Sequence, residues 1–315
     1  MFPRTLIVHS LPEISADYEI ESIVKENNEI KINFFSYYTL YKYYTQLSNT
    51  KDVKLGDPME LSSNIRNAFH SGASRRVWLK DAEESEADLA REFGEVESVQ
   101  WTRNTMKIVF MEIGSALKFV KHYSSDLKRI GFVRNDEERL ENRTLYFGSI
   151  TSDITEKDLI SAIVGGDIYT CKILRDRSCG FVSFVSSESA SAFLALCKAE
   201  PMRIKGNNIK VSTANGTKIT IEGIIACYDG ATRVLECPKE YRNEIEEYGD
   251  IEEIIEEEGK IRVSFFNLMD AYRAKKKMEG KERCDIYYGK DKCGRISSRD
   301  IMLYLQEIEY NKYIS

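Results

Sequence analysis

The sequence predicts an α+β protein made of four tandem copies of one small domain, followed by a C-terminal helix. Two observations support this prediction. A phenylalanine that closes a strand-like string recurs at intervals of 76, 74 and 81 residues, at Phe34, Phe110, Phe184 and Phe265. After each one, a helix-like segment places two apolar or aromatic side chains three residues apart, which puts both on one helical face.

The third repeat shows its elements most clearly. Strand 145–150 is followed by Thr155 and Asp158, spaced as in a capping box that opens a helix, and Gly165-Gly166 ends that helix. Two strands follow at 168–174 and 180–184. The helix that carries Ala190 and Phe193 comes next, before a last strand at 209–212. The order is therefore β-α-β-β-α-β.

The same order fits the other repeats. Repeat two runs from Val77 to Val133, and repeat four from Val234 to Tyr288. Repeat one leaves little room for a first helix before the strand that ends at Phe34. After repeat four, Ser297 and Asp300 have the spacing of a helix cap, and the helix would carry Ile301, Leu305 and Ile308 on one stripe. That helix either packs on its neighbour or covers a sheet face.

Two similar connectors divide the repeats into two pairs. Gly72-Ala73-Ser74-Arg75 precedes repeat two, and Gly230-Ala231-Thr232-Arg233 precedes repeat four, each after a mildly apolar stretch. The charged segment between the pairs is typical of a solvated linker. The expected divisions are repeat one 1–58, connector 59–74, repeat two 75–135, linker 136–142, repeat three 143–214, connector 215–231, repeat four 232–292 and helical tail 293–315.

Composition limits the class of protein. Hydrophobic residues make up 42% of the 315 residues and charged residues 30%, as in globular domains. The apolar runs are too short for a transmembrane helix, so no membrane partner is expected. The seven cysteines include no CxxC pair and the three histidines are scattered, which indicates a reducing, intracellular setting with no metal site and no cofactor.

The sequence gives little support for an enzyme. It lacks a GxxxxGK[ST] phosphate loop, a GxGxxG turn, an HExxH zinc motif and a GxSxG elbow. Cys179, taken as a nucleophile, has no histidine near it in the sequence. No catalytic residue is therefore expected.

Two strings in repeat three carry the strongest functional signal: 145–150 and 177–184. Strand alternation turns Tyr146 and Phe181 away from the core. The opposite face would be filled by Leu145, Phe147, Val182 and Phe184. If the two strands are adjacent, Tyr146 and Phe181 lie side by side on an exposed face, an arrangement on which bases of single-stranded RNA stack.

These strings resemble the two signature strands of the RNA-recognition motif (RRM), a ferredoxin-like βαββαβ domain, and the whole chain resembles a protein of four RRMs. The Gly-Ala-[Ser/Thr]-Arg connectors and the short loop 173–177 are similar to those of the fungal negative-regulator-of-differentiation type. The resemblance implies binding of single-stranded mRNA in post-transcriptional regulation. It places the protein in ribonucleoproteins, in the cytoplasm in preference to the nucleus.

The resemblance also implies roles for individual residues. Tyr146 and Phe181 are the stacking residues, and Cys179 holds a further position of the same face that is usually aromatic. Arg177 stands where the family places a basic residue against phosphate or base, and Ser178 replaces the usual glycine. On the flanking strands, Lys172 and Lys210 are expected to assist.

The other repeats depart from this pattern. At the position of Phe181 they carry Lys31, Lys107 and Arg262, and at the position of Tyr146 they carry Ile7, Trp78 and Leu235. Trp78 beside Lys107 makes repeat two a secondary RNA site, unless Trp78 is buried or packs against another domain. Repeats one and four are expected to be structural or protein-binding. The tyrosine cluster at 37–44 belongs to a helix behind the sheet.

The main alternative is a protein-interaction scaffold in a splicing complex or another ribonucleoprotein. The net charge of −6 and the isoelectric point near 5.5 favour this alternative, since RNA binders are usually basic. The charge is uneven, however. Residues 143–214 hold nine basic and seven acidic side chains, whereas residues 232–292 hold thirteen and sixteen. Repeat three is therefore the better site for RNA.

Overall fold

The structure is a computed structural model, and it describes residues 4–11, 19–47, 53–57, 61–133, 143–216, 218–279 and 285–314. The chain forms two compact units. Unit 1 comprises residues 1–139 and 219–228, and unit 2 comprises residues 140–218 and 229–315. The charged linker expected at 136–142 lies outside the described residues.

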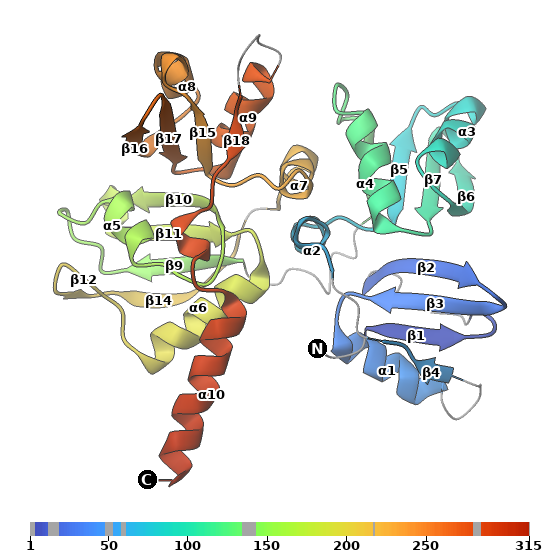
Figure 1. The fold of residues 1–315 in the computed structure, drawn as a ribbon, viewed down its shortest axis with the longest axis horizontal. Helices are drawn as coiled ribbons and strands as arrows, with labels where there is room; N and C mark the ends of the chain where they lie inside the picture. The colour runs from blue at the N-terminus through green and yellow to red at the C-terminus, as the bar shows by residue number, and fades with distance from the viewer. Residues whose placement is uncertain are drawn as a thin grey trace. The chain divides into compact units, whose positions relative to one another are not determined.

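Repeat three has the predicted order of elements (Figure 1). They are β9 (Thr144–Gly148), α5 (Glu156–Ser161), β10 (Ile168–Leu174), β11 (Cys179–Phe184), α6 (Ser187–Ala199) and β14 (Lys210–Ala214), with a small hairpin of β12 (Arg203–Ile204) and β13 (Asn207–Asn208) before the last strand. The sheet is antiparallel, in the order β10-β11-β9-β14. The two signature strings are therefore the central strands of the sheet.

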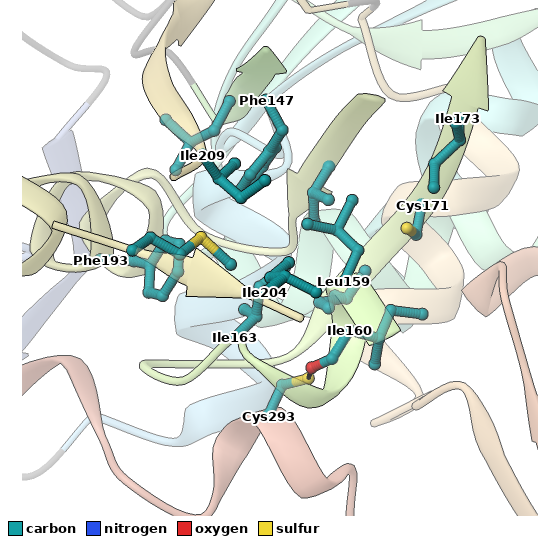
Figure 2. Packing of buried hydrophobic residues seen from close by; sticks show 14 of the residues in the cluster. Phe147, Leu159, Ile160, Ile163, Cys171, Ile173, Phe193, Ile204, Ile209 and Cys293 are labelled. Atoms are coloured by element: carbon teal, nitrogen blue, oxygen red, sulfur yellow. Dashed lines mark hydrogen bonds between the residues drawn. The ribbon is translucent and has the colours of Figure 1, made fainter. Parts of the chain in front are cut away.

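Local sequence explains these elements. The Thr155 hydroxyl accepts a hydrogen bond from the backbone N–H of Asp158, and the Thr155 N–H donates one to the Asp158 carboxylate, which caps α5 as predicted. Alternating side chains of β9 and β11 meet residues of α5 and α6 in one core (Figure 2). That core includes Leu145, Phe147, Val182, Phe184, Leu159 and Phe193, all at most 2% exposed. The predicted core face is confirmed.

Repeats two and four have the same architecture, with sheet orders β6-β7-β5-β8 and β16-β17-β15-β18. Repeat two consists of β5 (Arg76–Lys80), α3 (Glu84–Glu92), β6 (Val96–Thr102), β7 (Thr105–Phe110), α4 (Ile113–His122) and β8 (Ile130–Phe132). Repeat four consists of β15 (Val234–Pro238), α8 (Arg242–Glu246), β16 (Ile251–Glu257), β17 (Lys260–Phe265), α9 (Leu268–Met278) and β18 (Tyr287–Tyr288).

Repeat one forms an equivalent sheet, in the order β2-β3-β1-β4. Its elements are β1 (Thr5–Val8), β2 (Ile20–Glu26), β3 (Glu29–Phe34), α1 (Tyr37–Leu47) and β4 (Val53–Leu55). The segment 12–18, where a first helix would stand, lies outside the described residues. Tyr37 and Tyr41 are exposed on α1, whereas Tyr43 is buried against Phe34, so the tyrosine cluster belongs to the helix and the core.

Each connector contains a helix: α2 (Ser63–His70) and α7 (Ile221–Tyr228). The two helices pack together within unit 1, where the Ser71 hydroxyl donates a hydrogen bond to the Cys227 sulfur at 3.3 Å. The apolar stretches noted before the two Gly-Ala motifs are therefore the packed faces of these helices. The sequence predicted ordered connectors, but not that α7 belongs to unit 1 while the repeats on both sides of it belong to unit 2.

Within each pair, the first repeat contacts the second through the same kind of backbone hydrogen bond. In unit 1, the N–H of Ile23 on β2 donates to the carbonyl of Met111, 2.9 Å away, in the turn after β7. In unit 2, the N–H of Cys171 on β10 donates to the carbonyl of Phe266, 3.3 Å away, in the turn after β17. Isolated bridges lie beside these bonds, between Ser22 and Glu112 and between Thr170 and Asn267. Both β2 and β10 are edge strands of their sheets, so their outward backbone groups are available for this contact.

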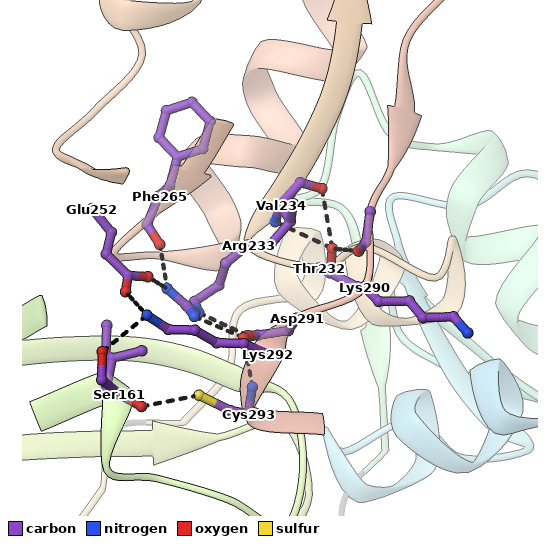
Figure 3. Close-up of polar contacts among 12 residues, drawn as sticks. Ser161, Thr232, Arg233, Val234, Glu252, Phe265, Lys290, Asp291, Lys292 and Cys293 are labelled. Carbon is purple, nitrogen blue, oxygen red and sulfur yellow. Dashed lines mark hydrogen bonds and ion pairs between the residues drawn. The ribbon is translucent and has the colours of Figure 1, made fainter. Parts of the chain in front are cut away.

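A buried arginine precedes the first strand in three repeats and ties that strand to its neighbours. Each guanidinium donates to the carbonyl that ends the third strand and to a glutamate in the bulge of the second strand. The sets are Arg4 with Phe34 and Glu21, Arg75 with Phe110 and Glu97, and Arg233 with Phe265 and Glu252. Arg233 also binds Asp291 through two hydrogen bonds of 2.8 Å (Figure 3). The arginine of each Gly-Ala-[Ser/Thr]-Arg connector is therefore a structural residue.

The C-terminal helix α10 (Ser298–Ile314) begins at the predicted cap, where Ser297 and Asp300 exchange hydrogen bonds. It packs on α6, and Ile301 is buried at this contact (Figure 1). The helix therefore lies on the helical side of repeat three and not on the open face of its sheet. Just before it, Cys293 enters the core of repeat three and donates to the carbonyl of Ile160 (Figure 2).

Candidate nucleic-acid interface

The platform face of repeat three is the sheet face opposite its core, and its centre is one row of residues in register across four strands. In strand order this row is Lys172, Phe181, Tyr146 and Ser212. The rings of Tyr146 and Phe181 lie 5.6 Å apart between centroids, in an edge-to-face arrangement at 66°. The Tyr146 and Phe181 side chains are partly exposed, and Lys172 and Ser212 at the two ends of the row are exposed. The structure thus brings together the aromatic pair expected from the sequence.

The next row shows how the Tyr146 ring is held. It consists of Leu174, Cys179, Gly148 and Lys210. A Cβ at Gly148 would lie 2.9 Å from Cε1 of Tyr146, so the ring lies over the glycine backbone. Cys179, the partner of Gly148 in register, is only 4% exposed. The expectation that Cys179 contacts RNA is therefore wrong in one respect: its position on the face is as expected, but its thiol is buried.

Hydroxyl groups extend the platform face beyond the aromatic pair. Thr144 and Ser183 are paired in register and share a hydrogen bond of 2.8 Å. Thr144 is buried, so the partly exposed Ser183 and the exposed Ser212 are the hydroxyl groups offered close to the aromatic row. The sequence alone does not single out these residues, because the register between strands decides whether they lie beside the aromatic row. The alternation of β9 and β11 was the available signal, since each hydroxyl lies two residues from an aromatic residue.

Cations border the platform face. Lys172 and Lys210 are exposed on β10 and β14, and within the described part of the chain neither forms an ion pair. Lys205 in the β12–β13 hairpin is already engaged by Asp158 at 2.7 Å. Hydrogen bonds from Lys205 and Thr155 lower the pKa of Asp158 to about 2. Lys172 and Lys210 are therefore the platform cations available to phosphate.

Arg177 lies in the turn before β11, outside both rows. Its side chain is largely in solvent, and its Nε lies 3.8 Å from Asp176 Oδ2. Ser178, the next residue, has φ +48° and ψ +42°, which is the left-handed conformation that glycine adopts most easily. This conformation explains why a glycine is usual at the position.

Replacing Ser178 by glycine is expected to stabilise unit 2 by about 0.5–1 kcal/mol, because it relieves the left-handed strain and removes only an exposed side chain. Urea unfolding of the full chain measures the change. Ser212→Gly is the matched control and should destabilise, because glycine weakens a strand interior. A less stable Ser178→Gly protein would contradict this account.

Comparisons with known proteins find RNA-binding relatives in yeast. No protein-family model matches the chain. The chain is 26% identical over 178 residues to the RNA-binding protein MRN1 of Saccharomyces cerevisiae, covering 50% of this chain and 29% of that protein. It is 30% identical over 70 residues to the RNA-binding protein NAB6 of the same yeast, covering 22% of this chain and 6% of that one. The chain thus spans less than a third of either relative.

The chain also matches solved structures of RNA-binding domains. The two RNA recognition domains of Sex-lethal from Drosophila melanogaster match 47% of this chain and all of that one, with 20% identity and a TM-score of 0.20. The three N-terminal RNA-binding domains of the yeast splicing factor Prp24 match 69% of this chain and 99% of that one, with 17% identity and a TM-score of 0.20.

The strand order is the deciding observation, because all four repeats place the second, third, first and fourth strands side by side. The chain has the fold of tandem RNA-recognition motifs. Repeats one to four are called RRM1 to RRM4 from here on.

RRM2 has its own platform row of Gln100, Lys107, Trp78 and Gly131. Trp78 and Lys107 are thus adjacent, as the sequence predicted, and Trp78 is half-buried on the sheet face. Lys80, which the sequence analysis did not single out, has its ammonium 5.2 Å from the centre of the Trp78 ring.

RRM1 and RRM4 place paired charges at the corresponding positions. In RRM4, Arg262 is in register with Glu236 and forms an ion pair with it at 3.3 Å. The assignment of Leu235 to the Tyr146 position was wrong: Leu235 is fully buried in the core, and Glu236 occupies the face. In RRM1, Lys31 pairs with Ile7 in register and with Glu26 in an ion pair. Both cations are therefore partly neutralised.

Other kinds of site find no support in the part of the chain that the structure describes. No described helix has the length and apolarity that a bilayer crossing requires. Among the same residues, no group of three or more potential metal ligands comes together. The six described cysteines are free thiols, and burial raises the pKa of Cys171 to about 12 and that of Cys197 to about 11, so both stay protonated.

Proposed function

We propose that this protein binds single-stranded mRNA through RRM3 and acts in post-transcriptional regulation without catalysing a reaction. The observation that carries the proposal is the Tyr146–Phe181 pair, held side by side on a sheet face whose opposite side supplies the core. The C-terminal helix supports it, because α10 packs on α6 and so lies behind the sheet.

Each aromatic ring offers a surface for one base. Stacking of a base on an aromatic side chain contributes about 1–3 kcal/mol and tolerates any base. Selectivity then depends on hydrogen bonds to base edges, for which the hydroxyls of Ser212 and Ser183 lie next to the aromatic row. Two bases at the centre and one or two at the borders make a short binding site.

Lys172 and Lys210 would neutralise phosphates on the two sides of the aromatic row, and Arg177 would reach the backbone or a base edge from its turn. Each phosphate contact to a single strand contributes a slope of roughly −0.7 in a plot of log affinity against log salt. With two or three phosphate contacts, the affinity should depend only modestly on salt. Few phosphate contacts are expected of a chain whose net charge is −6.

The direct test uses the full chain and a fluorescently labelled, random-sequence RNA octamer, with binding followed by anisotropy at moderate salt. The proposal expects saturable binding that is weaker for double-stranded RNA, because paired bases cannot stack on the platform. If no fraction of the random pool binds, the proposal is wrong. Selection of the bound fraction and its sequencing would give the preferred motif.

A protein-interaction scaffold is the second candidate, and RRM4 is the domain that favours it. Its sheet face pairs Arg262 with Glu236 and exposes Ile255 and Tyr287, at 42% and 59%. The scaffold function predicts that a protein partner stays bound to the full chain after nuclease treatment and is released by changes at Ile255 and Tyr287. Loss of every association together with the RNA would argue against it.

A further inference from the structure

Strand β6 of RRM2 lies at the edge of its sheet, in the place that β2 and β10 hold in RRM1 and RRM3. In those two repeats the edge is in use, since the N–H groups of Ile23 and Cys171 donate to the turn of the next repeat. Val99 is the matching residue of β6, because all three pair with the residue two positions before the phenylalanine that ends the third strand. Within the described residues no such bond reaches Val99, whose N–H therefore points out of an open edge.

Burial agrees with this difference. Ile23 and Cys171 are each 4% exposed, whereas Val99 is only partly buried. The contact in RRM1 is an antiparallel bridge between Ser22 and Glu112. The second strand of the repeat is thus an edge that this chain already uses to bind an antiparallel segment, and in RRM2 that edge has no occupant among the described residues.

The other open edges of the four sheets have features that discourage pairing with another chain. The strands β4, β8 and β18 are three, three and two residues long. The strand β14 begins with the exposed Lys210, and β16 has four glutamates among its seven residues. In contrast, β6 is seven residues long, and its single charged side chain, Glu97, is paired with Arg75 at 2.9 Å. Among the described edges, β6 is therefore the one best suited to strand pairing.

An exposed tryptophan adds apolar surface to this edge. Trp101 is 45% exposed. It is in register with Met106, and Val99 is in register with Ile108, and both partners are core residues. Trp101 and Val99 therefore point to the helical side of the sheet, away from the platform face where RNA is expected. A strand placed beside β6 would cover both side chains.

The sequence of β6 fits an antiparallel copy of itself. With Val99 opposite Val99, a two-fold axis passes between the two strands, and each Val99 donates its N–H to the carbonyl of the other. Gln100 then lies opposite Ser98, and these neutral polar side chains can share a hydrogen bond. Trp101 lies diagonally opposite Val99 of the other copy, within reach of an aromatic side chain.

Charge favours the same arrangement. Glu95 stands directly before β6 and Arg103 directly after it. Both are exposed, and neither forms an ion pair within the described part of the chain. Antiparallel pairing brings Glu95 of each copy to Arg103 of the other, whereas parallel pairing would place like charges together.

We propose that β6 of RRM2 pairs in antiparallel fashion with β6 of a second copy of this chain, which makes the protein a symmetric dimer. The interface is separate from the proposed function and does not depend on it. A dimer holds two RRM3 platforms in one particle. An RNA with two binding sites would therefore bind more tightly than an RNA with one, through effective concentration.

Sedimentation velocity of the full chain without RNA tests the dimer. The average mass should rise towards that of two chains as the protein concentration increases from about 1 to about 100 µM. Hydrogen exchange at the two ends of this range locates the interface. The outward N–H groups of Val99 and Trp101 should exchange more slowly at high concentration, whereas Gln100, whose N–H faces β7, should not change.

Backbone and side-chain variants test the edge itself. Val99→Pro removes the outward N–H, and Trp101→Glu places a carboxylate opposite Glu97, so each should weaken the dimer about tenfold or more. Ile254→Pro is the matched control, because Ile254 holds the same position on β16. Tyr41→Glu, on the exposed surface of α1, is the control for Trp101→Glu. Both controls should leave dimerisation unchanged.

A charge exchange tests the register. Glu95→Arg alone places like charges at both ends of the interface and should weaken the dimer about threefold. Adding Arg103→Glu should restore the affinity, because the opposite charges then meet again. These two changes alter exposed side chains only, so they remain informative even if Val99→Pro lowers stability.

A chain that stays monomeric over the whole concentration range overturns the inference, and so does a dimer that Val99→Pro and Trp101→Glu leave intact. If the chain is monomeric and these variants instead lose a different protein, β6 pairs with that protein and the assignment to a second copy is wrong. RNA binding is measured separately. Trp101→Glu should leave the affinity for the RNA octamer unchanged, so a failure of the dimer and a failure of the proposed function are distinguishable.

Discussion

The full chain with Tyr146→Ala and Phe181→Ala is expected to bind the random RNA octamer at least about 30-fold more weakly than the unchanged protein. Each lost stack removes about 1–3 kcal/mol, and each 1.4 kcal/mol corresponds to a factor of ten in affinity. Both rings lie on the platform face and not in the core, so the fold should survive the double change. Anisotropy titration measures the affinity, and thermal unfolding checks the fold.

Matched aromatic variants make this result specific. Tyr287→Ala removes an exposed tyrosine from the sheet face of RRM4, and Tyr41→Ala removes one from α1. Neither change should reduce RNA affinity more than twofold. Phe147→Ala, one residue from Tyr146 but fully buried, should instead cost about 3–5 kcal/mol of stability. Unchanged affinity in the Tyr146/Phe181 double variant would place the RNA site elsewhere on the chain.

Arg233→Met is expected to destabilise RRM4 by about 3–5 kcal/mol, because it leaves the buried Asp291 carboxylate without its cation and leaves Glu252 paired with Lys292 alone. The guanidinium donates to Asp291 twice at 2.8 Å, to Glu252 at 3.0 Å and to the carbonyl of Phe265. Arg233 and Asp291 have no exposed side-chain surface. Hydrogen exchange of the full chain should show loss of protection in β15 and β17, the strands that this residue joins (Figure 3).

An exposed arginine of the same domain serves as the control. Arg242 pairs with Glu246 and Glu256, but it stands in solvent, and Arg242→Met should leave stability nearly unchanged. Adding Asp291→Asn to Arg233→Met should recover part of the loss, since it removes the buried charge that has lost its partner. A protein with Arg233→Met that unfolds like the original would mean that the network contributes nothing to stability.

The sequence predicted the repeats and the strands well because both depend on local periodicity. Strand alternation around Tyr146 and Phe181, and the recurring phenylalanine anchors, survive in a single sequence without knowledge of packing. The three buried arginines also left a signal, since each stands directly before its first strand with a glutamate 17 to 22 residues later. Only the recurrent pairing reveals their role, because a single connector arginine is usually solvated.

The errors arose where packing in three dimensions decides. Leu235 and Glu236 are neighbours, and a one-residue shift of register exchanges the core face and the platform face. Cys179 is buried beside Gly148, its partner in register, over which the Tyr146 ring lies. No pattern in the sequence encodes this position of the ring. The attachment of α7 to unit 1 depends on contacts between residues more than 150 positions apart.

The way Cys293 and Ile301 complete RRM3 bears on how such a chain can be divided. Both residues follow RRM4 in the sequence, yet Cys293 is fully buried in the core of RRM3 and Ile301 is buried on its helical side. A fragment cut at residue 214 would carry an open core and an uncovered helix. A fragment that keeps the complete packing of RRM3 must therefore extend through RRM4 to the C-terminal helix.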